Sequence, residues 1–300
     1  MDHPLYRLAI LITVMFGLLI QPAAASDSES SVTEQVDAKP ASRYDTRYFI
    51  LKPHKRNYVL PITGTDNFHD DAYENIPLFS DNFEDIEAKY QLSLKFPLID
   101  PSFLFDNDSF HFGITIQSWW QIYADDISKP FRETNYQPEL FYRAPTPWQP
   151  FGGDLVLGIG LEHQSNGRSQ ALSRSWNRLY GEVLFTKGNF KTYFKPWYRL
   201  PENEKDNPND ADGDDNPDIR DYMGNYQIEF EYLWYDVGLE VMLRKNFTSH
   251  KGAVEVGVTF PIWSGLRGYM QYFNGYGESL IDYNHNQQKL GLGIMFDTYF

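Results

Sequence analysis

The sequence predicts an all-β protein, a transmembrane antiparallel β-barrel of about 12 strands. Three observations lead to this fold class. From about residue 89 onward, apolar and polar residues alternate with a period of two, as in strands that have one apolar and one polar face. Aromatic residues make up 17% of a chain whose mean hydropathy is nevertheless negative. The polar faces of the predicted strands also carry many charges, which suits a wet or ion-paired lumen.

The first 25 residues have the pattern of a secretory signal peptide. Arg7 precedes a long apolar run, and three alanines at 23–25 supply a cleavage site of the A-x-A type. The alternative is a retained membrane anchor, but Gln21-Pro22 interrupts the run before it reaches a comfortable spanning length. We therefore expect residues 1–25 to be a cleaved signal peptide and the mature chain to be exported to the bacterial outer membrane.

Residues 26–88 are predicted to precede the barrel as a polar lead-in and an N-terminal extension. The stretch up to Tyr44 is rich in Ser, Glu and Asp and has no periodicity, which is typical of a flexible segment. Residues 48–65 are more apolar but are broken by prolines, which favours an ordered extension over a barrel strand. The barrel is accordingly predicted over residues 89–300.

The length of this region sets the number of strands. Residues 89–300 are 212 residues, and roughly 10 residues per strand with about 8 per connection give about 12 strands, an even number as in bacterial single-chain barrels. The clearest alternating segments are 90–96, 110–116, 155–161, 190–194, 228–234, 254–260 and 290–296.

Two architectures can carry this alternation. A soluble sandwich or lipocalin-like barrel buries the apolar face inside, whereas an outer-membrane barrel turns it toward lipid and keeps a polar lumen. Aromatic residues at strand ends favour the membrane barrel, because they resemble interfacial girdles. These pairs are Trp119-Trp120, Trp197-Tyr198 and Tyr272-Phe273, and the charges that a lumen would hold are Lys191, Lys195, Arg199, Glu229, Glu231 and Glu255.

Composition excludes several kinds of function. The net charge of −15 argues against a nucleic-acid partner, which needs a basic face. The chain has no cysteine, so disulfides, thiolate metal sites and cysteine nucleophiles are excluded. Residues 201–221 hold nine acids against Lys205 and Arg220, a net charge of −7. We expect a solvated loop there; the alternative is a further divalent-cation site, although the final Glu of an EF-hand is missing.

Residues that could perform catalysis lie between 162 and 180. His163 and Ser165 occupy one face of a predicted strand, with Cα atoms about 6.5–7 Å apart, so the imidazole can act as a general base on the hydroxyl. Asn177, from the next strand, can orient the imidazole. All three residues share the parity of the apolar face, which implies a substrate within the membrane. The structural alternative is a polar strand end with Asn166-Gly167 as its turn.

A longer set of motifs resembles the bacterial outer-membrane phospholipase A family. The string HQSNGRS…SRSWNRLY is similar to the active-site block of that family. Further similar segments occur in the same order from about residue 90 to the C-terminus. They are SWWQ (118–121), PFRETNYQPELF (130–141), KPWY (195–198), DNPDI (215–219), YMGNYQ (222–227) and GYGESLIDYN (275–284). The apolar last strand ending on Phe300 also resembles the assembly signal of such barrels.

The resemblance implies a role for individual residues. Ser165 would be the nucleophile, His163 the general base and Asn177 the group that orients His163. The implied reaction is hydrolysis of acyl esters of membrane phospholipids, of the A1/A2 and lysophospholipase type. The N–H of Gly167 would help to stabilise the oxyanion.

The resemblance also implies Ca²⁺ as cofactor and a reversible homodimer. Arg168 and Ser173 match ligand positions through backbone oxygens, and Ser173 also through its hydroxyl; oxygen ligands suit a hard cation. Ser128 matches a serine that a second subunit donates, although its surroundings differ from the serine-rich run of the family. The chain departs from the family at Ile116. The family has a glutamine near this position, and that glutamine makes a hydrogen bond across the dimer.

Two other functions remain open from the sequence. A non-enzymatic outer-membrane barrel, either a small porin or a structural protein, would leave the shared face of His163, Ser165 and Asn177 unexplained. A barrel hydrolase that modifies lipid A would use similar chemistry on a different lipid.

Overall fold

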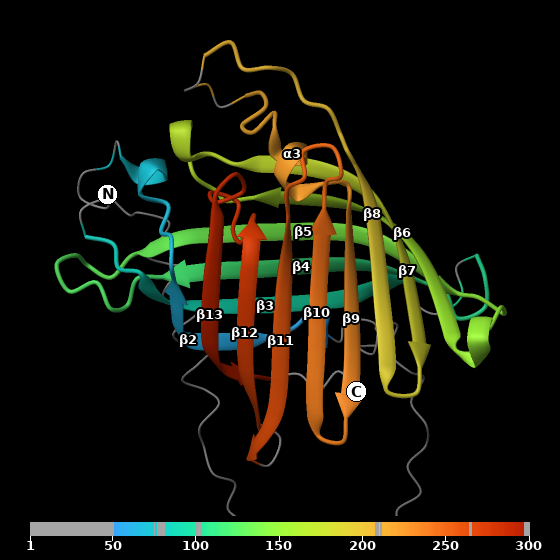
Figure 1. Ribbon diagram of the computed structural model, residues 1–300. Coiled ribbons are helices and arrows are strands. Elements are labelled where there is room, and N and C mark those ends of the chain that lie inside the picture. The colour runs from blue at the N-terminus through green and yellow to red at the C-terminus, as the bar shows by residue number, and fades with distance from the viewer. Residues whose placement is uncertain are drawn as a thin grey trace, which may run out of the picture. The chain divides into compact units, whose positions relative to one another are not determined.

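The chain folds as a closed antiparallel β-barrel (Figure 1). The structure is a computed structural model that describes residues 51–74, 76, 82–99, 102, 104–207, 210, 212–263 and 266–296. The predicted signal peptide, the lead-in before residue 51 and Phe300 lie outside the described residues. Within the described ranges, none of the helices is long and apolar enough to cross a membrane.

Twelve strands, β2 to β13, make up the barrel, and pairing of β3 with β4 closes it. The two-residue β1 pairs with β3 next to the start of β2. The predicted fold class and strand number are therefore confirmed. The strands are β1 Lys52–Pro53, β2 Tyr58–Thr65, β3 Ile86–Ile99, β4 Ser109–Trp120, β5 Phe131–Pro145, β6 Asp154–Ser165, β7 Ser175–Lys187, β8 Phe190–Arg199, β9 Tyr226–Trp234, β10 Val237–Lys245, β11 Gly252–Trp263, β12 Leu266–Tyr276 and β13 Asn286–Met295.

Short helices occur only in connections of the described chain. They are η2 Asp70–Tyr73, η3 Pro150–Gly152, η4 Gln170–Leu172 and α3 Ile219–Met223. Most of the long connections lie at the end of the barrel where β6 ends and β7 begins, which we call the loop rim. The opposite end, which carries tight turns such as that between β7 and β8, is called the turn rim.

The barrel begins at Tyr58, earlier than the sequence predicted. β2 pairs with β13 on one side and with β3 on the other, so it is a full member of the wall. Its pairing shifts register between Leu60 and Thr63, on either side of Pro61. A proline lacks the N–H that a ladder needs, and a bulge is where a strand tolerates it. The proline that argued against a strand is thus accommodated at an irregularity.

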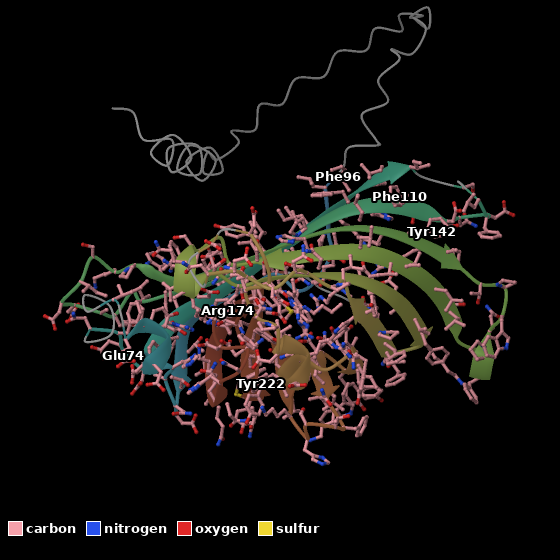
Figure 2. The ribbon with its side chains drawn as sticks, turned by 90° about the horizontal axis from the view of Figure 1, so that it is seen from above. Glu74, Phe96, Phe110, Tyr142, Arg174 and Tyr222 are labelled. Carbon is pink, nitrogen blue, oxygen red and sulfur yellow. The ribbon has the colours of Figure 1, made fainter. Side chains whose placement is uncertain are left out.

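The outer face of the barrel is apolar. The outward residues of β6, Leu157, Ile159 and Leu161, are 45%, 54% and 51% exposed. A continuous apolar surface of this kind is stable in lipid and unfavourable in water. Figure 2 shows Phe96 and Phe110 near Tyr142, on three adjacent strands, and well apart from Arg174 and Tyr222. These aromatics lie toward the turn rim, as an interfacial girdle requires.

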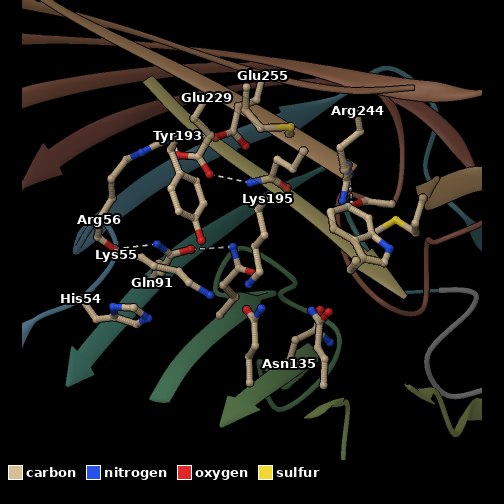
Figure 3. A pocket seen from close by; sticks show the side chains of 18 of the residues that line it. His54, Lys55, Arg56, Gln91, Asn135, Tyr193, Lys195, Glu229, Arg244 and Glu255 are labelled. Carbon is tan, nitrogen blue, oxygen red and sulfur yellow. Dashed lines mark hydrogen bonds and ion pairs between the residues drawn. The ribbon is translucent and has the colours of Figure 1, made fainter. Parts of the chain in front are cut away.

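The lumen is filled by ion pairs. Arg56, from the segment between β1 and β2, contacts Glu229 at 3.2 Å and Glu240 and Glu255 at 3.1 Å. Lys195 of β8 forms a further ion pair with Glu162 of β6. Four of these residues, Arg56, Lys195, Glu229 and Glu255, line a cavity of about 400 Å³ and are labelled around it in Figure 3. Buried charges are tolerated here because they are paired.

A second buried cluster closes the loop rim. Residues 277–283 are buried, and Asp282 accepts hydrogen bonds from Arg132 at 3.1 Å and from Ser279 at 2.6 Å. The guanidinium of Arg132 also contacts both oxygens of Glu87, at 2.9 and 3.0 Å. Burial alone would raise the pKa of Asp282, but the charge of Arg132 and these hydrogen bonds hold that pKa well below its ordinary value of 3.8.

This depressed pKa makes the contribution of Asp282 depend on pH. A carboxyl whose pKa is lowered in the folded state stabilises the fold at pH values above its ordinary pKa. This contribution is lost as the pH falls toward the pKa of the folded state. We expect Asp282→Asn to lower the free energy of unfolding by about 2 kcal/mol near neutral pH, because a charge-assisted contact is lost. Below about pH 4 the difference from the wild-type chain should shrink.

Urea unfolding in detergent micelles at neutral pH and at about pH 3, followed by tryptophan fluorescence, measures this difference. Asp126→Asn, at an exposed loop position, is the matched control. An Asp282→Asn difference that is equal at both pH values would contradict the assignment.

Candidate active site

β6 and β7 position the candidate catalytic residues. In their antiparallel ladder His163 lies opposite Asn177, and Ser165 lies opposite Ser175. Because side chains alternate between the faces of a strand, His163 and Ser165 point outward with Leu161, while the buried Glu162 points into the lumen. His163, Ser165 and Asn177 therefore share the outward face of the barrel wall.

The structure brings His163 and Asn177 into direct contact. Nδ1 of His163 and Oδ1 of Asn177 are 2.9 Å apart. Ser165 lies two residues further along the same face, at the end of β6. Over the described residues no hydrogen bond joins the hydroxyl of Ser165 to the imidazole of His163; such bonds are often long in a resting enzyme and shorten when substrate binds.

Asn166 shapes the loop that follows the candidate nucleophile. Its side chain is buried; Oδ1 accepts from the backbone N–H of Arg168 at 3.2 Å and of Arg174 at 2.9 Å, and Nδ2 donates to the carbonyl of Leu172 at 2.8 Å. Gly167 has a φ of +62°, which favours glycine. The turn therefore holds the exposed backbone of Gly167 two residues after Ser165.

The predicted calcium ligands lie in two loops. Arg168 and Ser173 are both in the loop between β6 and β7, whereas Ser128 is exposed in the loop between β4 and β5. The guanidinium of Arg168 donates to the carbonyls of Phe131 and Arg132, at 3.0 and 2.6 Å, which ties the loop to β5. The hydroxyl of Ser173 donates to Asp215 at 2.8 Å.

The donors available around Ser173 are oxygens. They are the hydroxyl of Ser173, the carboxylate of Asp215, which is paired with Lys205, and the backbone carbonyl of Ser173, which accepts from the guanidinium of Arg174 at 2.7 Å. Such a set fits a hard cation. Among the described residues there is no group of three or more His, Cys, Asp or Glu side chains that could hold a metal.

The acidic stretch 201–221 is not simply a solvated loop. Asp215 accepts from both Ser173 and Ser175, and Lys205 pairs with it at 2.5 Å. Glu202 accepts from Nδ2 of Asn177 at 3.1 Å. The contacts with Ser173, Ser175 and Asn177 join residues at least 25 positions apart, so the local charge pattern did not predict them. The acidic stretch thus contacts the face that carries the candidate residues.

The acidic stretch also packs on the buried loop 277–283. The hydroxyl of Tyr283 donates to Asp218 at 2.6 Å. Deeper in the barrel mouth, Oδ1 of Asn135 accepts from the N–H of Leu280 at 2.9 Å, and its amide donates to Glu133 at 2.6 Å. Hydrogen bonds therefore join the β6–β7, β8–β9 and β12–β13 loops at the loop rim.

Comparisons with known proteins agree on a single family. Residues 34–296 match the family model described as Phospholipase A1. A phospholipase A1 of Klebsiella pneumoniae is 38% identical over 98% of this chain and 98% of its own length. A phospholipase A1 of Escherichia coli is 38% identical over 95% of this chain and 98% of its own length.

Solved structures give the same result. The outer membrane phospholipase A from Escherichia coli superimposes with a TM-score of 0.76 at 39% identity, covering 83% of this chain and 99% of that one. The Salmonella typhi outer membrane phospholipase, solved as a dimer with bound calcium, has a TM-score of 0.76 at 39% identity and covers 84% of this chain and 94% of that one. The chain therefore belongs to the phospholipase A1 family.

Proposed function

We propose that this chain is a calcium-dependent phospholipase of the bacterial outer membrane that hydrolyses acyl esters of membrane phospholipids with Ser165, His163 and Asn177. The observation that carries the proposal is the 2.9 Å contact between His163 and Asn177 on the outward face, with Ser165 two residues along. A group on this face meets the acyl and glycerol part of a lipid, not the lumen. Hydrolysis is of the A1/A2 and lysophospholipase type.

The reaction follows from the roles of the three side chains. Oγ of Ser165 attacks the ester carbonyl carbon while its proton passes to Nε2 of His163. The N–H of Gly167 stabilises the tetrahedral oxyanion. Collapse breaks the bond to the glycerol oxygen, which takes the proton from His163 and leaves as a lysophospholipid. Water, deprotonated by His163, then releases the fatty acid and restores Ser165.

Calcium would be held by Arg168 and Ser173 through backbone oxygens, by the hydroxyl of Ser173, and by Ser128 of a second copy of the chain. Bound there, it would supply positive charge beside the oxyanion. The oxygen donors around Ser173 support this assignment. The Salmonella typhi relative is described as a dimer with bound calcium, which supports both the cation and a reversible homodimer.

The dimer contact would differ from that of the family. Gln117 faces the lumen, where its amide donates to Gln91 at 2.7 Å, so it cannot replace the glutamine that the family presents to its partner. Ile116 lies on the outer face between Leu92 and Tyr136. We therefore expect apolar packing at this position of the dimer.

The role of Asn177 gives a direct test. We expect Asn177→Ala to lower kcat about 30-fold, since it removes one hydrogen bond of about 2 kcal/mol that orients the base. KM should stay near the wild-type value. A structure of the Escherichia coli relative is described as an active-site mutant with asparagine changed to alanine, which supports an asparagine in the active site.

The assay is release of fatty acid from a phospholipid in mixed micelles with excess Ca²⁺. Asn189→Ala, in the turn between β7 and β8 at the other rim, is the control. An Asn177→Ala chain with wild-type kcat would remove Asn177 from the mechanism. Offering lipopolysaccharide beside phospholipid in the same assay tests lipid A hydrolysis, which the proposal excludes.

A further inference from the structure

The amide of Asn177 has two partners, and only one of them belongs to the proposed catalytic residues. Its oxygen faces Nδ1 of His163 at 2.9 Å, and its nitrogen donates to Oε1 of Glu202 at 3.1 Å. The three side chains form a line that runs from the candidate base to a carboxylate of the acidic stretch.

The chain places Glu202 at this position through the end of β8. The backbone N–H of Leu200 donates to the carbonyl of Asn177 at 2.8 Å, which continues the pairing of β7 with β8 for one residue. Pro201 then ends the ladder because it has no N–H. Glu202 follows at once, partly buried beside Asn177.

A carboxylate at this point fixes the orientation of the amide. An ionised carboxylate can only accept hydrogen bonds, so the NH₂ group of Asn177 must face Glu202 and the oxygen must face His163. The amide oxygen then requires a proton on Nδ1 of His163. The lone pair consequently lies on Nε2, the nitrogen that a general base must offer to Ser165.

Glu202 also supplies charge to an otherwise neutral group. An asparagine orients an imidazole without stabilising the imidazolium that forms when Ser165 attacks. A carboxylate one hydrogen bond further away polarises the amide and favours that cation, at a strength reduced by its partial exposure.

We propose that Glu202 is a positioning residue that holds Asn177 in the orientation required for catalysis. Glu202 would then act as a fourth group behind Ser165, His163 and Asn177. This inference rests on the proposed function.

The test compares two variants that remove one negative charge from the same stretch. A glutamine at position 202 can donate as well as accept, so both orientations of the Asn177 amide become accessible. We expect Glu202→Gln to lower kcat about fivefold with KM and the Ca²⁺ requirement unchanged. Asp206→Asn, at an exposed position of the stretch, should keep the wild-type kcat.

A double-mutant cycle separates positioning from a general effect on the loop. If Glu202 acts through Asn177, the substitution Glu202→Gln should have no further effect on kcat in the Asn177→Ala background. An undiminished fivefold effect in that background would overturn the proposal, as would a wild-type kcat for Glu202→Gln itself. These two results concern Glu202 alone and leave the proposed function intact as long as Ser165→Ala is inactive. An active Ser165→Ala chain would refute the proposed function itself.

Discussion

Ser165→Ala is expected to reduce phospholipid hydrolysis by about ten-thousandfold or more, to a rate near the background of the assay. The reason is that the hydroxyl oxygen forms the covalent bond to the acyl group, and neither His163 nor Gly167 can replace it. Loss of a nucleophile removes the whole covalent route, whereas loss of an orienting group such as Asn177 only slows it. The fatty acid released from micellar phospholipid measures the effect.

The barrel itself should be unaffected by this change. Ser165 is the last residue of β6, and no hydrogen bond of its hydroxyl contributes to the described part of the structure. The variant should therefore keep the heat-modifiable migration of a folded barrel in gel electrophoresis. Ser169→Ala, an exposed serine four residues further along, is the matched control and should keep full activity. A folded Ser165→Ala chain with full activity would exclude Ser165 as nucleophile.

Removal of calcium is expected to have the next largest effect. Excess EDTA should slow hydrolysis about 100-fold or more, a loss comparable to that of an oxyanion-stabilising group. Added Ca²⁺ should restore the rate, and Mg²⁺ should restore less of it, because carbonyl and hydroxyl oxygens in a loop suit the larger and more flexible coordination sphere of calcium.

The oligomeric state should respond in the same experiment. If Ser128 comes from a second copy, chemical cross-linking should show more dimer with Ca²⁺ than with EDTA. Ser128→Ala should then weaken the Ca²⁺ dependence of cross-linking, while Ser102→Ala, in the connection between β3 and β4, should not. A hydrolysis rate unchanged by EDTA would contradict the role assigned to the cation.

Much of the barrel was predictable because the alternation of apolar and polar residues is visible within each strand. A wall that separates lipid from a lumen forces alternation along every strand, and this alternation is visible in a single segment such as 155–161. β2 was missed because Pro61 and its neighbours interrupt the alternation, and only pairing with β13 and β3 shows where the irregularity is absorbed. Whether the first 25 residues are cleaved stays a prediction.

The residues of the candidate site were likewise predicted only in part from the sequence. His163 and Ser165 share a face by spacing alone, and Asn177 reaches them through an antiparallel register across one short loop. Glu202 and Asp215 could not be found by spacing, because loop contacts depend on where the strands bring their ends. In the sequence these two acids are indistinguishable from their exposed neighbours.

The central claim, that Ser165 is the nucleophile, is tested most directly by covalent labelling. An alkyl fluorophosphonate forms a bond between its phosphorus and an activated serine oxygen and loses fluoride. Tryptic cleavage after Arg143, Arg168 and Arg174 places Ser165 in the peptide 144–168, where it is the only serine, and separates it from the serines of 169–174 and 175–178. The account predicts one label, on peptide 144–168, that appears with Ca²⁺ and parallels the loss of activity. A label on peptide 169–174 or 175–178, or inactivation with peptide 144–168 unlabelled, would contradict it.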